Sequence, residues 1–120
     1  MKNVKESCQY YPIPVLREAL RRQASELSAR LSRSVARLTS CDSLPCLEYG
    51  DEIKAQHDIA EKLFFIQQSR NALEQCIAGN NVTLRYRWSD GGATQTKFRK
   101  SGLNQVKITG IPRKVSFAKA

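Results

Sequence analysis

The spacing of apolar residues along this chain changes once, at residues 79–81, and the change separates two kinds of secondary structure. Before it, apolar or small residues recur at steps of three and four, which is typical of helices. After it, apolar and basic residues alternate at every second position, which is typical of strands with two different faces. The sequence therefore predicts an α+β protein, with helices first and an antiparallel sheet second.

The first periodic segment predicts a helix over residues 14–39. This spacing is the heptad repeat of a coiled coil, sustained for about three repeats. Pro14 suits the first helical turn, where a missing N–H costs nothing. The seam consists of Leu16, Leu20, Ala24, Leu27, Leu31, Val35 and Leu38.

A cluster of turn-forming residues over 39–50 predicts a connection to a second helix. Asp51 and Glu52 then place negative charge in a first helical turn, where the helix dipole favours it. Gly79 and the two asparagines after it predict the end of this helix, which we place at 51–78. We expect the two helices to fold back as an antiparallel hairpin, because they are of similar length and joined by a short connection.

Three runs in the last third of the chain alternate between apolar and polar residues and predict strands. A Ser-Asp-Gly-Gly segment between the first two runs is a strong hairpin signal. Val115 and Phe117 suggest a short fourth strand, so we expect a sheet of three to four strands packed on the helices. The three runs cover residues 82–88, 94–99 and 105–109.

The length of 120 residues predicts a single domain over 1–120. We divide it into an N-terminal arm (1–13), the helical hairpin (14–78) and a basic sheet and tail (79–120). The arm has no apolar run that resembles a signal peptide. The longest apolar run, 63–66, is far below the roughly 20 residues that span a bilayer. These features predict a cytoplasmic protein without a membrane partner.

The formal charge of +9 is concentrated at one end of the chain. Residues 1–79 hold 11 Lys or Arg and 10 Asp or Glu, a formal charge of +1. Residues 80–120 hold 9 Lys or Arg and a single acid, Asp90, a formal charge of +8. Such a concentration attracts polyanions, which include nucleic acid and acidic protein surfaces.

The alternation in the predicted strands puts basic residues on one face of the sheet. Side chains on neighbouring strands stand about 5 Å apart, so these cations would form a continuous patch. Nucleic acid is the favoured partner, because each neutralised phosphate releases condensed counterions. The alternative is that the cations keep an exposed sheet soluble and block strand addition. The candidate binding residues are Arg85, Arg87, Lys97, Arg99, Lys100, Lys107, Arg113 and Lys114.

The aromatic residues of the same strands, Tyr86, Trp88 and Phe98, alternate out of phase with the cations. We therefore expect them in the core. Base stacking needs aromatic rings and cations on the same surface, so phosphate-directed contact fits the pattern better.

A second basic stripe runs along the first helix. It could follow a phosphate backbone, or it could pair with the acids of the second helix, and internal pairing is the more frequent behaviour. The residues that define the stripe are Arg17, Arg21, Arg30 and Arg37, with Arg22 and Arg33 beside them.

The connection between the helices forms a hairpin tip that could dock on a partner or could simply cap a helix. Its residues are Asp42, Glu48, Tyr49, Asp51 and Glu52. Cys41, Cys46 and His57 are weak zinc candidates, because their spacing matches no short zinc-binding pattern. We therefore expect no metal and no other cofactor.

The sequence holds no phosphate-binding loop, no nucleophile elbow and no metal-binding His pair, so we do not expect an enzyme. The leading hypothesis is a small basic accessory protein that binds nucleic acid or a nucleoprotein complex with an acidic surface. The alternative is an adaptor or inhibitor that docks on a larger nucleic-acid-processing machine through the hairpin, its tip or the basic face. A homodimer formed through the heptad seam is a third possibility.

Overall fold

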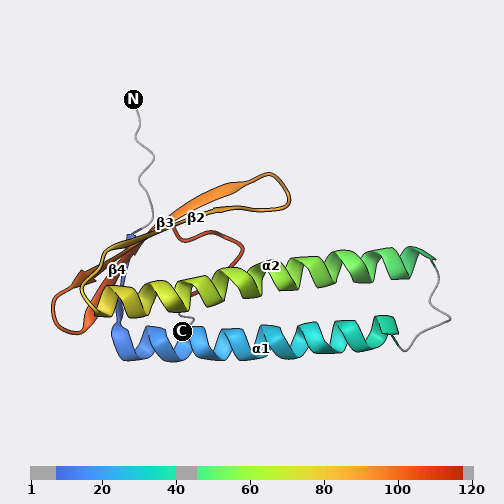
Figure 1. The fold of residues 1–120 in the computed structure, drawn as a ribbon, viewed down its shortest axis with the longest axis horizontal. Helices are drawn as coiled ribbons and strands as arrows, with labels where there is room; N and C mark the ends of the chain where they lie inside the picture. The colour runs from blue at the N-terminus through green and yellow to red at the C-terminus, as the bar shows by residue number, and fades with distance from the viewer. Residues whose placement is uncertain (1–7, 40–45, 118–120) are drawn as a thin grey trace.

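The computed structural model describes residues 8–39 and 46–117, and it has a helical hairpin on one side of a four-stranded antiparallel sheet (Figure 1). The predicted α+β architecture is confirmed. The distal halves of both helices extend beyond the sheet (Figure 1). No helix in the described part of the chain is long and apolar enough to cross a membrane. The elements are β1 (Cys8–Pro12), α1 (Ile13–Thr39), α2 (Cys46–Ile77), β2 (Val82–Arg87), β3 (Ala93–Ser101) and β4 (Gln105–Thr109).

Helix α1 has the predicted extent, and Leu16, Leu20 and Ala24 on its seam are buried. The predicted seam is wrong at Val35, which is 41% exposed, whereas its neighbour Ser34 is buried. Ser34 follows Leu16 by 18 positions, which is five turns at about 3.6 residues per turn. In a straight α-helix, positions seven residues apart do not stay on the same side, because the helix has about 3.6 and not 3.5 residues per turn. Ser34 therefore occupies the buried side in place of Val35.

Helix α2 begins at Cys46, five residues before its predicted start at residue 51. The connection was expected to include Gly50, but Gly50 lies inside the helix. A single glycine in a helix costs only about 1 kcal/mol relative to alanine, so it weakens a helix without ending it. The end of α2 is as predicted, because Gly79 has a φ of 107° and stops the helix in the left-handed conformation.

The turn at 89–92 joins β2 and β3 as predicted. The Trp88 N–H donates to the Gly92 carbonyl (2.7 Å), and the Gly91 N–H donates to the Trp88 carbonyl (2.9 Å). Asp90 accepts a further hydrogen bond from the Gly92 N–H (2.9 Å). The turn therefore uses both a glycine with positive φ, Gly91 at 99°, and a side chain that bonds its own backbone.

The fourth strand of the sheet is β1 and not the segment around residues 115–117, so this prediction was wrong. β1 pairs with β4 in antiparallel register, with Cys8 opposite Thr109 and Tyr10 opposite Lys107. The sheet order is β1-β4-β3-β2. The arm predicted at 1–13 therefore supplies an edge strand, and this strand leads directly into α1.

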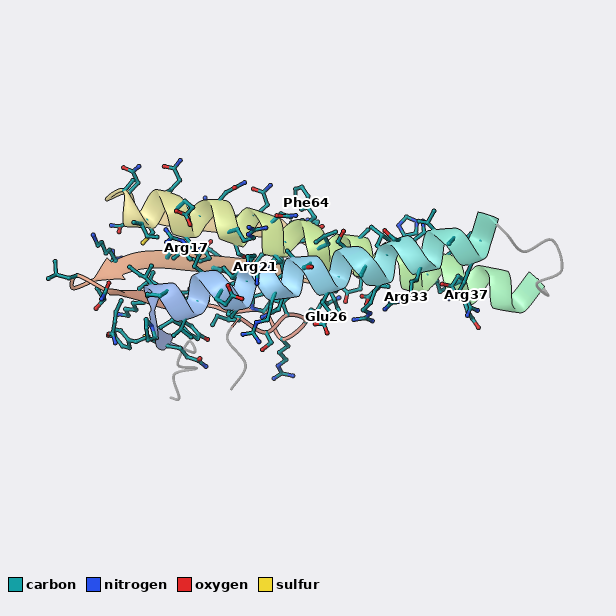
Figure 2. All side chains as sticks on the ribbon, turned by 90° about the horizontal axis from the view of Figure 1, so that it is seen from below. Arg17, Arg21, Glu26, Arg33, Arg37 and Phe64 are labelled. Carbon is teal, nitrogen blue, oxygen red and sulfur yellow. The ribbon has the colours of Figure 1, made fainter. Side chains whose placement is uncertain are left out.

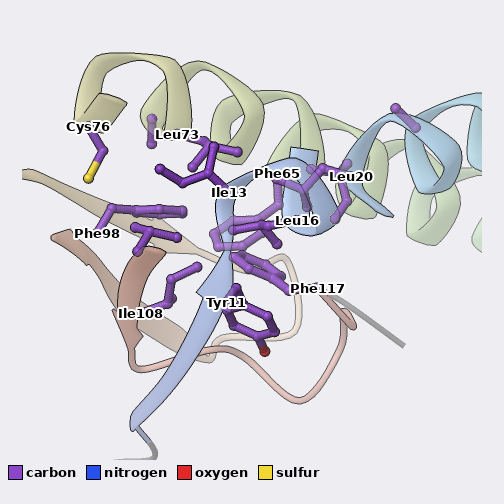
Figure 3. Packing of buried hydrophobic residues seen from close by; sticks show 14 of the residues in the cluster. Tyr11, Ile13, Leu16, Leu20, Phe65, Leu73, Cys76, Phe98, Ile108 and Phe117 are labelled. Carbon is purple, nitrogen blue, oxygen red and sulfur yellow. The ribbon is translucent and has the colours of Figure 1, made fainter. Parts of the chain in front are cut away.

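Gly110 explains why the chain does not continue as a strand after β4. Its φ is 82°, and its carbonyl accepts a hydrogen bond from the Thr96 hydroxyl (2.8 Å). A Cβ at this position would lie 2.2 Å from the Gln95 carbonyl oxygen. The backbone thus passes against β3 and leaves the sheet, and Phe117 ends up buried between the sheet and the helices (Figure 3).

The core lies between the inner face of the sheet and the sheet-proximal parts of both helices (Figure 3). Phe65 of α2 contacts Trp88 and Phe117, with ring centroids 5.4 and 6.4 Å apart. Phe98 is fully buried and stacks on Phe117 at 6.0 Å. The predicted core positions of Trp88 and Phe98 are confirmed, and Tyr86 is half-buried at the same inner face.

Candidate nucleic-acid interface

The outer face of the sheet is the side turned away from the helices (Figure 1). Side chains alternate across a strand, so the residues between the buried positions of β2, β3 and β4 point outward. Five basic residues of these strands occupy such positions, as the alternation predicted, whereas Lys100 of β3 does not. All of them are exposed except one, which is half-buried at β4. We call this set the cationic face, and it consists of Arg85, Arg87, Lys97, Arg99 and Lys107.

The strand register places these cations in a continuous arrangement. Arg99 lies directly opposite Lys107, and Lys97 lies two residues before Arg99 on the same strand. Arg85 lies opposite Gln95 and donates a hydrogen bond from Nε to its Oε1 (3.3 Å). Opposed positions in a sheet have Cβ atoms about 5 Å apart, so like charges at Arg99 and Lys107 repel each other.

No carboxylate neutralises the cationic face within the described residues. The ion pairs of residues 8–39 and 46–117 all involve other cations. Asp90, the only acid after residue 79, bonds Lys114 instead. The positive charge of the face is therefore not compensated by this part of the molecule.

Lys114 lies apart from the cationic face, although it was among the predicted binding residues. Its ammonium group bonds Asp90 and lies 5.2 Å from the centroid of the Trp88 ring. The bond to Asp90 raises the pKa of Lys114, and the bond from Lys114 lowers the pKa of Asp90. Lys114 thus has a partner for its charge and an aromatic ring beneath it, and it secures the segment after β4.

Lys100 and Arg113 do not occupy outward positions of the strands, because Lys100 is on the helix side of β3 and Arg113 lies outside the strands. Lys100 is opposite Val106, a buried residue, so it is on the helix side of the sheet. Its charge acts on Cys76 in α2, where burial raises the pKa of the thiol and Lys100 lowers it. Arg113 is exposed in the irregular segment after β4. Lys100, Arg113 and Lys114 are therefore not among the outward-facing cations of the strands.

The basic stripe of α1 pairs with α2 at two of its positions, which was the favoured prediction. Arg17 donates from Nε and Nη2 to the two carboxylate oxygens of Glu74, both at 2.9 Å. This bidentate bond lowers the pKa of Glu74. Nearer the tip, Arg37 Nε lies 3.3 Å from Glu52. Figure 2 labels Arg17 near the beginning of α1 and Arg37 near its end.

The rest of the stripe is divided between bonds within α1 and free surface. Arg21 donates to Glu18 at 2.5 and 3.0 Å, and Arg22 lies 3.9 Å from the same carboxylate. Arg30 and Arg33 are exposed and form no ion pair with the described residues. The stripe is therefore mixed in charge and less suited to a polyanion than the cationic face.

Three residues of the predicted hairpin tip, Asp42, Glu48 and Tyr49, have side chains outside the described residues. Glu52 does not project from the tip. Its carboxylate is held between the helices, where Oε2 accepts a hydrogen bond from the Ser34 hydroxyl (2.6 Å) and Oε1 pairs with an arginine of α1. The remaining residue, Asp51, is exposed.

The weak zinc candidates are not brought together by the described part of the structure. His57 is exposed on α2, whereas Cys41 and the side chain of Cys46 lie outside the described residues. Among the residues that are described, no three His, Cys, Asp or Glu side chains gather in a way that could hold a metal ion.

Tyr10 is a residue of the outer face that sequence reasoning missed. The register puts it opposite Lys107, and its side chain is 54% exposed. The arm was not expected to join the sheet, so its aromatic residues were not considered with the cations. The signal was the pair Tyr10 and Tyr11, which prefer strands and which β1 places on opposite faces, with Tyr11 buried.

The surface is also hollowed along the cationic face. A depression of about 390 Å³ follows β2 and β3 and is lined by residues that include Arg85, Arg87 and Gln95. Larger hollows of about 620 and 580 Å³ lie against α1. These contain Glu26 and Glu74 beside their arginines, so both signs of charge line them. The charged residues that line the hollow on the sheet, Arg85 and Arg87, are both cations, so it suits an anion better than the two hollows against α1.

Comparison with protein-family models, with curated proteins and with solved structures gave no match. The class of the protein is therefore defined by its own fold and surface. It is an α+β protein in which a helical hairpin supports an antiparallel sheet, and the cationic face of this sheet forms no ion pair within residues 8–39 and 46–117.

Proposed function

We propose that this protein is a small accessory protein that binds nucleic acid through its cationic face, chiefly by contacts with backbone phosphates. The observation that carries the proposal is the clustering of five cations on one side of a sheet, with no carboxylate partner in residues 8–39 and 46–117. Opposed like charges cost stability in a sheet. A polyanion would offset this cost, and phosphate contacts would release counterions.

Such contacts carry little sequence information, because phosphates are the same at every base. The proposal therefore predicts binding that tolerates changes of sequence and depends strongly on salt. For duplex DNA, five neutralised phosphates correspond to a slope of about −4.5 in a plot of log Kobs against log salt concentration. A cytoplasmic location belongs to the same proposal.

The test is a charge-reversal variant with three substitutions on the cationic face, Arg85→Glu, Arg87→Glu and Arg99→Glu. It is compared with a control that makes the same change in net charge on α1, Arg22→Glu, Arg30→Glu and Arg33→Glu. Binding of a 20-base duplex and a 20-base single strand is measured at two salt concentrations. We expect the face variant to lose binding and the control to keep most of it.

Two results would overturn the proposal. One is a wild-type protein that binds neither probe at low salt, or binds without salt dependence. The other is an equal loss of affinity in both variants, because this would mean that net charge and not the cationic face governs binding. Far-UV circular dichroism of both variants verifies that the helices and the sheet are intact.

A second candidate function is an adaptor or inhibitor that docks on a larger machine. The observation in its favour is the helical hairpin, whose distal halves extend beyond the sheet (Figure 1). Phe64 is 50% exposed on α2 and adds an apolar contact point (Figure 2). Pull-down from host lysate after nuclease treatment separates the two candidates. Protein partners that survive nuclease and are lost on Phe64→Ser would favour the adaptor.

A further inference from the structure

Tyr10 is an aromatic side chain that the fold leaves without a partner. Its ring is 54% exposed, and no hydrogen bond or ring contact joins it to the described residues. Its neighbour Tyr11 shows the opposite behaviour, because Tyr11 is buried and its hydroxyl donates to Gln9 Oε1 (2.6 Å). A single exposed aromatic residue is ordinary on a protein surface. The significance of Tyr10 therefore depends on what surrounds it.

Tyr10 stands at one end of a row that crosses three strands. Lys107 is directly opposite Tyr10 on β4, and Arg99 is directly opposite Lys107 on β3. Adjacent strands are about 4.8 Å apart, so an aromatic ring and two cations occupy roughly 10 Å of the same surface. Lys97 adds a third cation at the neighbouring outward position of β3.

We propose that the nucleic acid bound by this face is single-stranded, and that one of its bases stacks on Tyr10 while Lys107 and Arg99 contact the adjacent phosphates. This inference rests on the proposed function and narrows it to one form of nucleic acid. Proteins that bind single strands combine a basic surface with aromatic side chains that stack on bases. The row from Tyr10 to Arg99 supplies both groups on one face.

A duplex fits the row less well than a single strand. In a duplex the flat faces of the bases are covered by their neighbours in the stack, and exposing one requires unstacking and unpairing. An unpaired base presents its face freely, so only a single strand uses Tyr10 without this cost. The carboxylates of an acidic protein surface would pair with the cations but would leave the tyrosine ring without an aromatic partner.

The dimensions of the sheet set the expected site size. The outer face spans four strands, which is three interstrand steps or roughly 14 Å. A stacked strand advances about 3.4 Å per nucleotide, so the face accommodates about four nucleotides. A strand that begins at Tyr10 would reach Arg85 and Arg87 at the opposite edge, where the hollow along β2 and β3 lies.

The test compares two DNA probes that carry the same phosphates. One is a 15-base thymidine strand, and the other is a 15-residue abasic strand without bases. Stacking of one base predicts that wild-type protein binds the thymidine strand about 5- to 150-fold more tightly than the abasic strand. Tyr10→Ala should remove this preference, whereas Tyr10→Phe should keep it. Leu103→Ala is the matched control, because Leu103 is a large apolar residue that is 92% exposed outside the row.

The inference is overturned if wild-type protein binds both strands equally, if Tyr10→Ala keeps the preference, or if a 15-base duplex binds as tightly as the single strand. Failure of the proposed function gives a different result. In that case the abasic strand does not bind, or its binding survives the glutamate substitutions at Arg85, Arg87 and Arg99. If Tyr10→Ala unfolds at the same temperature as wild type, its loss of preference for the thymidine strand is not caused by unfolding.

Discussion

Arg99 and Lys107 lie directly opposite each other on β3 and β4, so two cations project outward from paired positions of the sheet. No carboxylate of the described residues forms an ion pair with either of them. A pair of opposite charge at these positions would stabilise the sheet, whereas a pair of like charge destabilises it. The arrangement therefore lowers the stability of the free protein, an expense that the proposed anionic ligand would offset.

The first prediction measures that expense directly. Arg99→Gln should raise the free energy of unfolding by about 0.2–1 kcal/mol at low salt, because it removes the repulsion with Lys107. The gain should shrink in 1 M salt, where the Debye length is only about 3 Å. Denaturant unfolding at both salt concentrations is the measurement. Arg30→Gln, on the exposed side of α1, is the control, and a gain independent of salt would contradict the repulsion.

The second prediction concerns Lys97 and Lys114, which the sequence pattern did not distinguish but which have different surroundings in the structure. Lys97→Ala should weaken the binding of nucleic acid and reduce the salt slope by about 1, because one phosphate contact is lost. Lys114→Ala should leave the slope unchanged, because the ammonium group of Lys114 already bonds Asp90. It should instead lower the free energy of unfolding through the loss of its contact with the Trp88 ring. Titration at several salt concentrations and thermal unfolding check the two effects. An unchanged slope for Lys97→Ala would remove that residue from the interface.

Local sequence patterns predicted most of the fold, because the signals lie within a few residues of one another. The heptad spacing of α1, the glycine after α2 and the turn at 89–92 each depend on local backbone preferences. Alternation in the strands likewise placed Arg85 and Arg99 on a face opposite Phe98, and the register confirms this arrangement.

The features that were missed depend on contacts between distant parts of the chain. β1 is a strand because it pairs with β4, about one hundred residues later, and no local pattern records that pairing. Residues 115–117 have strand-like composition, but the path of Gly110 against β3 takes them out of the sheet. Lys100 lies on the helix side because β3 continues to Ser101, beyond its predicted end at residue 99, and side chains alternate along the strand. Tyr10 was missed for the same reason as β1.

The third prediction concerns acid pH and the pair formed by Arg17 and Glu74. The hydrogen bond and charge of Arg17 lower the pKa of Glu74 from its ordinary value of 4.5. Because the pKa is lower in the folded state than in the unfolded state, the pair stabilises the protein above pH 4.5 and this contribution is lost as the pH falls below it. Both side chains are more than half exposed, so the effect is at most about 1 kcal/mol.

Arg17→Met tests this pair. The variant should be less stable than wild type at pH 7, and the difference should shrink as the pH falls below 4.5 and through the lowered pKa of Glu74 in the folded state. Urea unfolding at a series of pH values is the measurement. Arg30→Met is the control, because Arg30 forms no ion pair with the described residues. A difference that does not shrink as the pH falls below 4.5 would show that Arg17 acts through packing and not through its charge.

The last prediction compares two glycines with opposite environments. At Gly110 a Cβ would lie 2.2 Å from a backbone oxygen of Gln95, and φ is 82°. Gly110→Ala must therefore shift the backbone or adopt a strained conformation, and we expect a loss of about 3 kcal/mol or more. At Gly50, inside α2, a Cβ has no atom within 4 Å. Gly50→Ala should raise stability by about 0.5–1 kcal/mol, because alanine is the better helix former.

Thermal unfolding of both variants checks the pair of changes, and their opposite signs exclude a general effect of adding a methyl group. The result also bears on the cationic face. Gly110 directs the chain out of the sheet after β4 and toward the position where Lys114 bonds Asp90. If Gly110→Ala were as stable as wild type, the chain would not pass against β3 at this point. Lys114 and Arg113 would then be free to join the outer surface, and the cationic face would not be limited to its five cations.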